Sequence, residues 1–385
     1  MNVLVLGAGL QGSVLVKDLV KSEWVEEIII GNMDVQRLKS LEAIDRGKVK
    51  GKQVDVRNHD SLIKLMGNID VVINGSDWRY NHVVTEAAIE AGVNLIDMGT
   101  IFDDVLEKQL KLHEAAEDAK VTIIPCCGLS PGITNVLTLY GASELDKVDE
   151  VHIKCGGIPQ IPKPPLDYRI VWSLDGVIDE YLERVTIVRN GKLEHVEPLS
   201  GLENIKFDNI QGELECFYTQ GLSTLPNSLN RVREMDYKTI RYSGHCEKIK
   251  LLASLGLLNS NPIEIRGNRL SPREFLVTHL SRLLALGADR DMVILKIDLI
   301  GEKRGRRAHH TFSMLAFFDE KNGITAMART TAFPCSIIAE MIAKTDINVK
   351  GVTPPERSVP PEPFIAKLAE KGIHIDERLT LTEPL

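Results

Sequence analysis

Short apolar runs alternate with segments of helical periodicity through the first 125 residues of this 385-residue chain. The runs predict strands at residues 2–6, 27–30, 52–56, 70–74, 93–97 and 121–125. Helices are predicted at 81–91, where Gly92 suits a C-cap, and at 103–119. Parallel strands buried on both faces are typically apolar throughout and are joined by helices. The pattern therefore predicts an α/β domain with a doubly wound parallel sheet over residues 1–125.

The rest of the chain has the alternation of antiparallel strands. Alternating runs flank Asn190-Gly191, which predicts a β-hairpin, and alternation recurs at 291–300, 309–318 and 324–330. Ser271, Pro272 and Glu274 predict the start of a helix whose expected apolar face is Phe275, Leu276, Leu280, Leu283 and Leu284. We expect residues 126–330 to form an α+β substrate and oligomerisation domain with a mixed or antiparallel sheet. Residues 331–385 are expected to return to the first domain, with a last helix near 362–371.

The first predicted strand leads directly into a glycine-rich turn. Gly7 permits a tight turn, Gly9 lets phosphates approach the backbone, and Gly12 lets the following helix lie close to its strand. The helix N-terminus, with Leu10 and Gln11 in its first turn, offers free N–H groups to a pyrophosphate. The segment predicts a Rossmann dinucleotide site. A nicotinamide cofactor narrows the chemistry largely to hydride transfer.

Further cofactor contacts are expected where the other strands end, because ligands of doubly wound sheets bind at the carboxyl ends of the strands. Asn32 stands where an acid usually binds the adenine ribose, and Asp34 is expected either to bind the ribose or to cap the next helix. No Arg follows Asn32 directly, which favours NAD over NADP, although Arg37 keeps NADP open. The remaining candidates at strand ends are Asp55, Val56, Asn74, Gly75, Ser76, Asp97 and Gly99.

Composition excludes several classes of partner. The net charge is −8 and no long basic run occurs, so neither nucleic acid nor an anionic membrane is an expected partner. No apolar run approaches the roughly 20 residues of a spanning helix, and the first strand begins at residue 2, without room for a signal peptide. The six cysteines lack paired CxxC spacing, and the chain has no HExxH motif. We therefore expect a cytoplasmic protein with reduced thiols and no metal.

Several blocks of sequence together resemble the saccharopine dehydrogenase-like family, and within it the lysine 6-dehydrogenases. The glycine loop alone is unspecific, whereas Cys155–Pro159 and Tyr237–His245 are typical of the family. The matching blocks run through nearly the whole chain, at residues 7–12, 87–93, 122–125, 128–135, 155–159, 164–168, 172–176, 237–245, 326–332 and 351–355.

The resemblance implies an enzyme with a small amino-acid substrate. The reaction implied for lysine 6-dehydrogenases is the oxidative deamination of L-lysine. Hydride leaves the ε-carbon of lysine for NAD, and the resulting imine takes up water and releases ammonia. The aldehyde that remains can cyclise. A homodimer or homotetramer is expected. Arg241 is the candidate for the substrate carboxylate, with a structural ion pair as the alternative. His245 is the candidate for a proton relay or for a cap of the helix that begins there, and Cys155 for an acid–base role or an inert buried thiol. The other candidates for the substrate pocket are Tyr168, Trp172, Ser173 and Glu215.

One block departs from the family pattern. Related saccharopine reductases carry acids within the block that here contains Ser130 and Thr134, which favours simple lysine oxidation. A saccharopine- or carboxynorspermidine-type dehydrogenase remains an alternative, as does a NAD-binding regulator that kept the fold without catalysis.

Overall fold

The computed structural model describes residues 1–207 and 210–384. Its first sheet is parallel and has the strand order β17-β6-β5-β4-β1-β2-β3. Apart from β17, this is the order of a doubly wound dinucleotide-binding fold, which confirms the predicted fold class. The strands are β1 (Asn2–Leu6), β2 (Glu27–Asn32), β3 (Val49–Gln53), β4 (Val71–Asn74), β5 (Asn94–Asp97), β6 (Thr122–Ile124) and β17 (Gly351–Val352).

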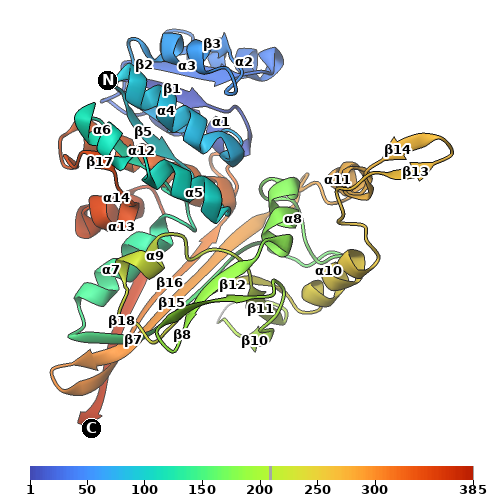
Figure 1. The fold of residues 1–385 in the computed structure, drawn as a ribbon, viewed down its shortest axis with the longest axis vertical. Helices are drawn as coiled ribbons and strands as arrows, with labels where there is room; N and C mark the ends of the chain where they lie inside the picture. Colours follow the sequence, from blue (N-terminus) through green and yellow to red (C-terminus); the bar gives the residue numbers. More distant parts are fainter. Residues whose placement is uncertain (208–209, 385) are drawn as a thin grey trace.

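Helices cover both faces of this sheet because its strands are apolar on both sides (Figure 1). Within β1, Val3 and Val5 contribute to one apolar core, and Leu4 and Leu6 contribute to another on the opposite face. The helices here are α1 (Leu10–Leu19), α2 (Val35–Glu42), α3 (His59–Met66), the 3₁₀ turn η1 (Trp78–Tyr80), α4 (Asn81–Ala91), α5 (Asp103–Leu110) and α6 (His113–Asp118).

The second sheet is mixed and has the order β10-β11-β12-β7-β15-β16-β18, with β8 pairing to β12 and β9. β12 and β7 are parallel, and the long β15–β16 hairpin is antiparallel. The strands are β7 (Lys147–Pro159), β8 (Val185–Arg189), β9 (Lys192–Val196), β10 (Glu203–Ile205), β11 (Leu214–Tyr218), β12 (Glu234–Tyr242), β15 (Asp291–Lys303), β16 (Arg306–Phe317) and β18 (Asp376–Pro384).

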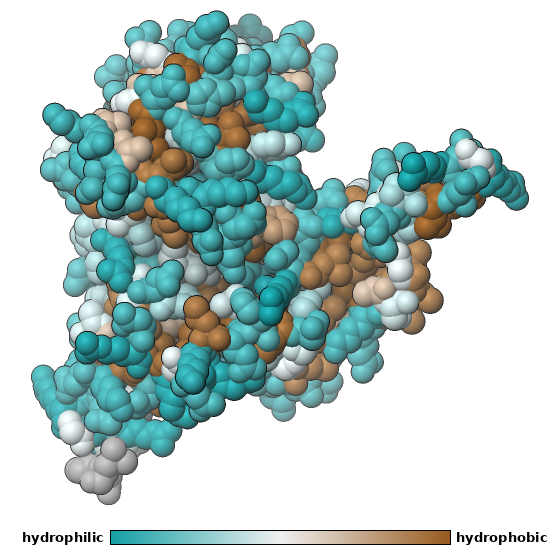
Figure 2. Space-filling model, viewed as in Figure 1, coloured by the Kyte–Doolittle hydropathy of each residue, from teal (hydrophilic) through white to brown (hydrophobic). Residues whose placement is uncertain are grey.

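One side of this domain extends into an arm with helices at its base and a small hairpin at its tip (Figure 1). Large apolar side chains are exposed on this arm, and Figure 2 shows apolar surface where it joins the body. The exposed residues are Leu251, Leu255, Ile263, Ile265, Phe275 and Leu283. The arm contains α10 (His245–Ser254), α11 (Pro272–Leu283), β13 (Ile263–Ile265) and β14 (Asn268–Leu270). The other helices of the second domain, outside the arm, are α7 (Ile133–Ser143), α8 (Leu174–Leu182) and α9 (Leu225–Ser228).

The C-terminal segment joins both domains. It contains α12 (Ala326–Ala343), α13 (Pro355–Ser358) and α14 (Pro361–Glu370). Lys371, just after α14, forms an ion pair of 2.7 Å with the buried carboxylate of Asp18 on α1. β17 pairs with β6, and β18 then pairs with β16 of the second sheet. The last part of the chain therefore ties the two sheets together. Within the described ranges, we find no helix long and apolar enough to cross a membrane.

Several predicted elements were correct in type but not in detail. The Asn190-Gly191 hairpin is present, and both residues have positive φ, as a tight two-residue turn requires. The third strand lies at 49–53, not 52–56, because a sheet-edge strand can be polar. The helix predicted at 103–119 breaks between Leu110 and His113.

Two predictions in the second domain were wrong. The strand predicted at 324–330 is the start of α12, because the Thr325 side chain accepts a hydrogen bond from the Ala328 N–H and caps a helix. On α11, Leu276 and Leu280 are buried, but Phe275 and Leu283 are 56% and 48% exposed. Alternation and helical phase are easily confused over such short segments.

Candidate active site

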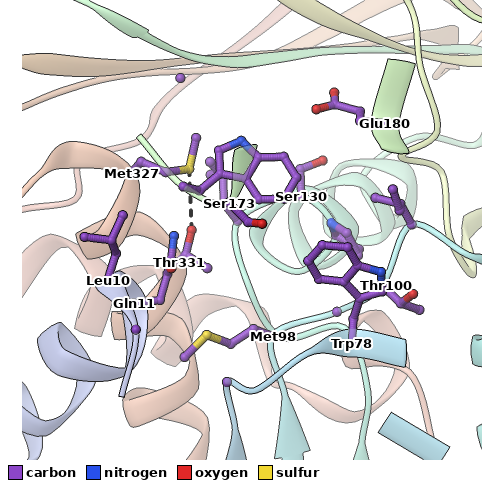
Figure 3. Close-up of a pocket in the computed structure, with 18 of the residues that line it drawn as sticks. Leu10, Gln11, Trp78, Met98, Thr100, Ser130, Ser173, Glu180, Met327 and Thr331 are labelled. Atoms are coloured by element: carbon purple, nitrogen blue, oxygen red, sulfur yellow. Dashed lines mark hydrogen bonds between the residues drawn. The ribbon is translucent and has the colours of Figure 1, made fainter. Parts of the chain in front are cut away.

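A cavity of about 540 Å³ lies between the first sheet and the second domain. Leu10 and Gln11 lie on one side of it, and Glu180 of α8 lies on the other (Figure 3). It opens at the carboxyl ends of β1, β4 and β5, where a doubly wound fold binds its ligand. The predicted residues that line the cavity are Gly9, Leu10, Gln11, Asn74, Gly75, Ser76, Gly99, Cys155, Trp172, Ser173 and Arg241.

The glycine loop has the geometry that a pyrophosphate site needs. A Cβ on Gly7 would lie 2.5 Å from the Gly75 carbonyl oxygen, and a Cβ on Gly12 would lie 2.0 Å from the Gly7 carbonyl oxygen. A Cβ on Gly9 would instead meet no atom within 4 Å. Gly9 precedes α1, whose N-terminus has no side-chain cap. The space in front of Gly9 and the free N–H groups of the helix fit a dinucleotide phosphate.

The ends of β4 and β5 shape the wall of the cavity. The Asn74 carboxamide is buried, accepts a hydrogen bond from the Ser76 hydroxyl (2.6 Å) and donates one to Asn81 (2.9 Å). Asp97 does not line the cavity, contrary to its predicted cofactor role. Its carboxylate accepts hydrogen bonds from the N–H groups of Gly99 (2.8 Å) and Cys126 (2.9 Å). These hydrogen bonds hold the loop that presents Gly99 to the cavity, and burial raises the pKa of Asp97.

At the end of β2, the predicted ribose contacts serve the protein itself. The Asn32 side-chain oxygen accepts a hydrogen bond from the Ala8 N–H (3.3 Å) and so supports the glycine loop. Asp34 accepts hydrogen bonds from the backbone N–H groups of Gln36 and Arg37, which makes it the cap of α2. Neither lines the cavity, whereas Arg37 does.

Asp55 and Val56 lie away from the cavity. Asp55 forms part of a separate shallow surface hollow and binds Arg57 through both carboxylate oxygens. These hydrogen bonds lower the pKa of Asp55 to about 2. This arrangement is a local ion pair, so the predicted cofactor contact at the end of β3 is not present in this structure.

Arg241 of β12 is buried and lines the substrate side of the cavity. Its Nε donates to the Tyr181 hydroxyl (2.7 Å), and its Nη1 donates to the Thr239 hydroxyl and the Ile240 carbonyl (2.8 Å each). Its Nη2 lies 3.6 Å from a carboxylate oxygen of Glu180. Nε and Nη1 are therefore occupied by the protein, and Nη2 remains to meet a ligand.

Glu180 is the functional candidate that motif reading missed. It is buried, lines the cavity, and accepts a hydrogen bond from the Thr219 hydroxyl (3.1 Å). Burial raises the pKa of Glu180, and the charge of Arg241 opposes this rise. A buried carboxyl group whose pKa is shifted, beside a buried cation in a cleft, marks a candidate functional site. The sequence signal that could have identified Glu180 is an acidic residue among the apolar residues of α8.

Three predicted substrate residues lie behind this pair. His245, Tyr168 and Glu215 are all buried and none lines the cavity. Glu215 accepts hydrogen bonds from the N–H groups of Gly244 (2.8 Å) and Cys246 (2.7 Å) and caps α10. The Tyr168 ring faces the Arg241 guanidinium at 5.2 Å. None of the three predicted contacts is present in this structure, because other side chains lie between these residues and the cavity.

His245 does not line the cavity, so the predicted proton relay has no direct contact with a ligand there. Burial, with the nearby charge of Arg241, lowers the pKa of His245 to about 3. Cys155 does line the cavity, but burial raises the pKa of its thiol to about 12. Both groups are therefore neutral near pH 7, and Cys155 presents an uncharged thiol to the cavity.

Aromatic side chains form another wall of the cavity. Trp78 of η1 and Trp172, just before α8, lie with ring centroids 6.4 Å apart and come from different domains. Ser173 caps α8 through the Gly176 N–H (3.2 Å). Arg79 joins the domains by an ion pair of 2.8 Å with Asp179 and also binds Asp77. The wall suits an aliphatic chain, and the charge of Arg79 is compensated within the protein.

No cluster of three or more His, Cys, Asp or Glu side chains able to hold a metal ion was found in residues 1–207 and 210–384. The cysteines in that part of the chain are all free and buried.

Fold and cavity define a two-domain dinucleotide-binding protein. Two family models match it: the saccharopine dehydrogenase NADP binding domain over residues 3–124 and the saccharopine dehydrogenase C-terminal domain over residues 128–373. The chain therefore belongs to the saccharopine dehydrogenase family. The first model is named for NADP, and the comparisons do not support the predicted preference for NAD.

Curated relatives are distant but extensive. The saccharopine dehydrogenase [NADP(+), L-glutamate-forming] of Schizosaccharomyces pombe is 24% identical, over 89% of this chain and 92% of its own. The carboxyaminopropylagmatine dehydrogenase of Synechocystis is 22% identical, over 97% and 96%. The bovine mitochondrial alpha-aminoadipic semialdehyde synthase is 22% identical over 99% of this chain. This chain spans only 48% of the length of that relative.

Solved structures support the fold. The apo saccharopine dehydrogenase (L-Glu forming) of Saccharomyces cerevisiae has a TM-score of 0.81 and 19% identity, covering 98% of this chain and 99% of its own. A homospermidine synthase of Legionella pneumophila in complex with NAD has a TM-score of 0.63 and 14% identity, covering 99% and 91%. At these identities the likeness establishes the architecture and not the substrate.

Proposed function

We propose that this chain is a nicotinamide-dinucleotide-dependent dehydrogenase that oxidises the ε-amine of L-lysine. The observation that carries the proposal is the Arg241–Glu180 pair, buried at the side of the cavity opposite the glycine loop. A carboxylate and an ammonium on one carbon require a cation and an anion side by side. The separation of 3.6 Å between Nη2 and the Glu180 carboxylate matches this need.

The charges of the lining distinguish lysine from bulkier substrates. Saccharopine carries three carboxylates, and two of them would need partners beyond the one at Arg241. The other arginines that line the described cavity are Arg79, bound to Asp77 and Asp179, and Arg37, 3.4 Å from Asp34 beside the glycine loop. The lining thus supports a substrate with one carboxylate and an aliphatic chain that packs against the wall formed by Trp78 and Trp172.

The glycine loop, Ser76 and Gly99 would hold the dinucleotide, whose nicotinamide supplies a hydride acceptor when bound. The ε-carbon loses hydride and the ε-nitrogen loses a proton, which leaves an imine. Water adds to the imine and ammonia leaves, which gives the aldehyde. In this account Arg241 holds the α-carboxylate and Glu180 holds the α-ammonium. Trp78 and Trp172 exclude water from the methylene groups of the substrate. The ε-ammonium, with an ordinary pKa near 10.4, loses its proton to solvent before hydride leaves.

The test is reduction of NAD or NADP by the purified chain, followed at 340 nm, with lysine, ornithine, saccharopine and carboxynorspermidine in parallel. Lysine is expected to have the highest kcat/KM, and its value is expected to rise from neutral to alkaline pH. Preferred turnover of saccharopine or carboxynorspermidine would replace this proposal by that of a related dehydrogenase. Dinucleotide binding without turnover of any of these would favour a regulator.

The proposal includes a homodimer or homotetramer in the cytoplasm. The supporting observation for self-association is the group of exposed apolar side chains on the arm, among them Leu255 and Phe275. Light scattering of the purified chain tests it, and a monomer at micromolar concentration would contradict it.

A further inference from the structure

A linear series of hydrogen bonds runs from Arg241 at the cavity wall deeper into the second domain. The Arg241 Nε lies 2.7 Å from the Tyr181 hydroxyl, which lies 2.9 Å from Nε2 of His245. Nδ1 of His245 lies 2.8 Å from the backbone carbonyl oxygen of Leu166. Arg241 lines the cavity, whereas Tyr181 and His245 do not. The series therefore begins at the cavity wall and ends on the backbone.

The donors and acceptors in this series have one consistent direction. The Leu166 carbonyl can only accept, so Nδ1 of His245 carries a proton and donates it. The Arg241 Nε–H can only donate, so the Tyr181 oxygen accepts from it and the tyrosine proton is free for Nε2 of His245. Nε2 must then be an acceptor, so the histidine is neutral.

The groups packed around His245 favour this neutral form. The rings of Tyr168 and Tyr181 lie with centroids 5.6 Å from the imidazole. The nearby charges are the cations of Arg241 and Lys248, and both lower its pKa together with burial. Each residue in this series of hydrogen bonds thus has a partner that is consistent with a neutral His245.

We propose that Tyr181 and His245 are positioning residues that fix the rotation of the Arg241 guanidinium, so that Nη2 faces the cavity and Glu180. The inference rests on the proposed function insofar as the ligand held there is an amino-acid carboxylate. Without the acceptor at Tyr181, Nε–H would be buried and unsatisfied, and the guanidinium would turn to find another partner. His245 acts by orienting the Tyr181 hydroxyl, so that its lone pair faces Arg241.

A matched pair of amide variants separates orientation from packing. In His245→Gln the amide extends to about the place of Nε2 and can accept from Tyr181. In His245→Asn it reaches only about the place of Nδ1 and can bond Leu166 but not Tyr181. Both variants lose the imidazole ring. Tyr181→Phe is the third variant, because it removes the hydroxyl and keeps the ring against Phe217, 5.9 Å away.

We expect His245→Asn and Tyr181→Phe to raise the KM for lysine about tenfold or more, with a smaller change in kcat and no change in the KM for the dinucleotide. His245→Gln is expected to keep most of the affinity for lysine. Hydrogen exchange of the Arg241 Nε–H, measured by NMR, is expected to be slow in the wild type and in His245→Gln and fast in the other two.

Equal KM values and equal exchange in His245→Gln and His245→Asn would overturn the inference, as would wild-type behaviour of Tyr181→Phe. The exchange readout needs no substrate, so the two proposals fail separately. If the wild type does not oxidise lysine but the exchange pattern is as expected, the proposed substrate is wrong and the orientation of Arg241 by this series of hydrogen bonds stands.

Discussion

The two sides of the cavity recognise their ligands by different means. The dinucleotide side is built from backbone and from glycines close together in sequence, at Gly7, Gly9 and Gly12, beside the ends of parallel strands. The substrate side is built from buried charged side chains on separate elements, Glu180 of α8 and Arg241 of β12. The first side is a local pattern common to many folds, whereas the second exists only after the second domain has folded.

The two sides of the cavity also differ in the free energy that they cost the protein when no ligand is bound. Free N–H groups at a helix N-terminus cost little when a ligand is absent, because water can reach them. A buried ion pair is expensive to desolvate and contributes little to stability compared with apolar packing. The Arg241–Glu180 pair is therefore better explained by what it binds than by the stability of the fold. Substitutions on the two sides should separate these effects.

The largest effect is expected for Arg241→Lys. A lysine keeps the charge but cannot reproduce the hydrogen bonds to Tyr181, Thr239 and the Ile240 carbonyl. We expect kcat/KM for lysine to fall about a hundredfold or more, while the dissociation constant for the dinucleotide stays unchanged. Steady-state kinetics and dinucleotide fluorescence titration measure both. A loss below threefold would show that the guanidinium does not bind the substrate.

Gly12→Ala and Gly9→Ala form a matched pair on the other side. A methyl group on Gly12 would collide with the Gly7 carbonyl, which should destabilise the fold by about 1–3 kcal/mol. A methyl group on Gly9 meets open space within the protein, so stability should be unchanged and only dinucleotide affinity should fall. Thermal unfolding and dinucleotide titration test the pair. Equal destabilisation by both variants would mean that Gly9 does not face the ligand.

A pH effect on stability should follow from the environment of His245. Its pKa is lowered from 6.5 to about 3 by burial, so the unfolded chain binds an extra proton between these values. Stability from this group is therefore lost as pH falls below about 6.5, by about 1.4 kcal/mol for each pH unit. Between pH 6.5 and 5, urea unfolding should show the wild type losing about 1.5 kcal/mol more than His245→Gln. Parallel losses would show that His245 is not held neutral.

The smallest effect concerns the choice of dinucleotide. Arg37 lines the cavity beside the glycine loop, and Asp34 and Asn32 are engaged with the backbone. If Arg37 meets a 2′-phosphate, Arg37→Ala should raise the KM for NADP about tenfold and leave the KM for NAD nearly unchanged. The ratio of the two KM values is the measurement. An equal change in both would place Arg37 away from the 2′ position.

The contrast between the two sides explains what could be predicted from sequence. Gly9, Gly75 and Gly99 were found because strand ends and glycine spacing are local signals. Arg241 was found through a family resemblance, but its neighbour Glu180 was not, because the pairing of α8 with β12 depends on folding between distant segments. His245 lies behind Arg241 and does not line the cavity. The sequence could not reveal this, since proximity to Arg241 along the chain does not determine which side chains face the cavity.

The strand at 324–330 failed for a more local reason. Alternation over a few residues does not exclude a helix, and the cap at Thr325 decides the outcome. Edge strand β3 was misplaced because its polar residues carry no apolar signal. Both errors affected the prediction of the site. Met327 and Thr331 of α12 line the cavity and were not predicted, and Asp55 and Val56 were predicted as cofactor contacts because the third strand was placed at 52–56.

The most direct test of the central claim compares lysine with 6-aminohexanoate, which keeps the carboxylate and the ε-amine but lacks the α-amine. If Glu180 holds the α-ammonium, the wild type should prefer lysine by about tenfold or more in kcat/KM, and Glu180→Gln should lose this preference chiefly through the KM for lysine. A Glu180→Gln variant that loses kcat equally with both compounds would contradict the account, because Glu180 would then act at the ε-amine.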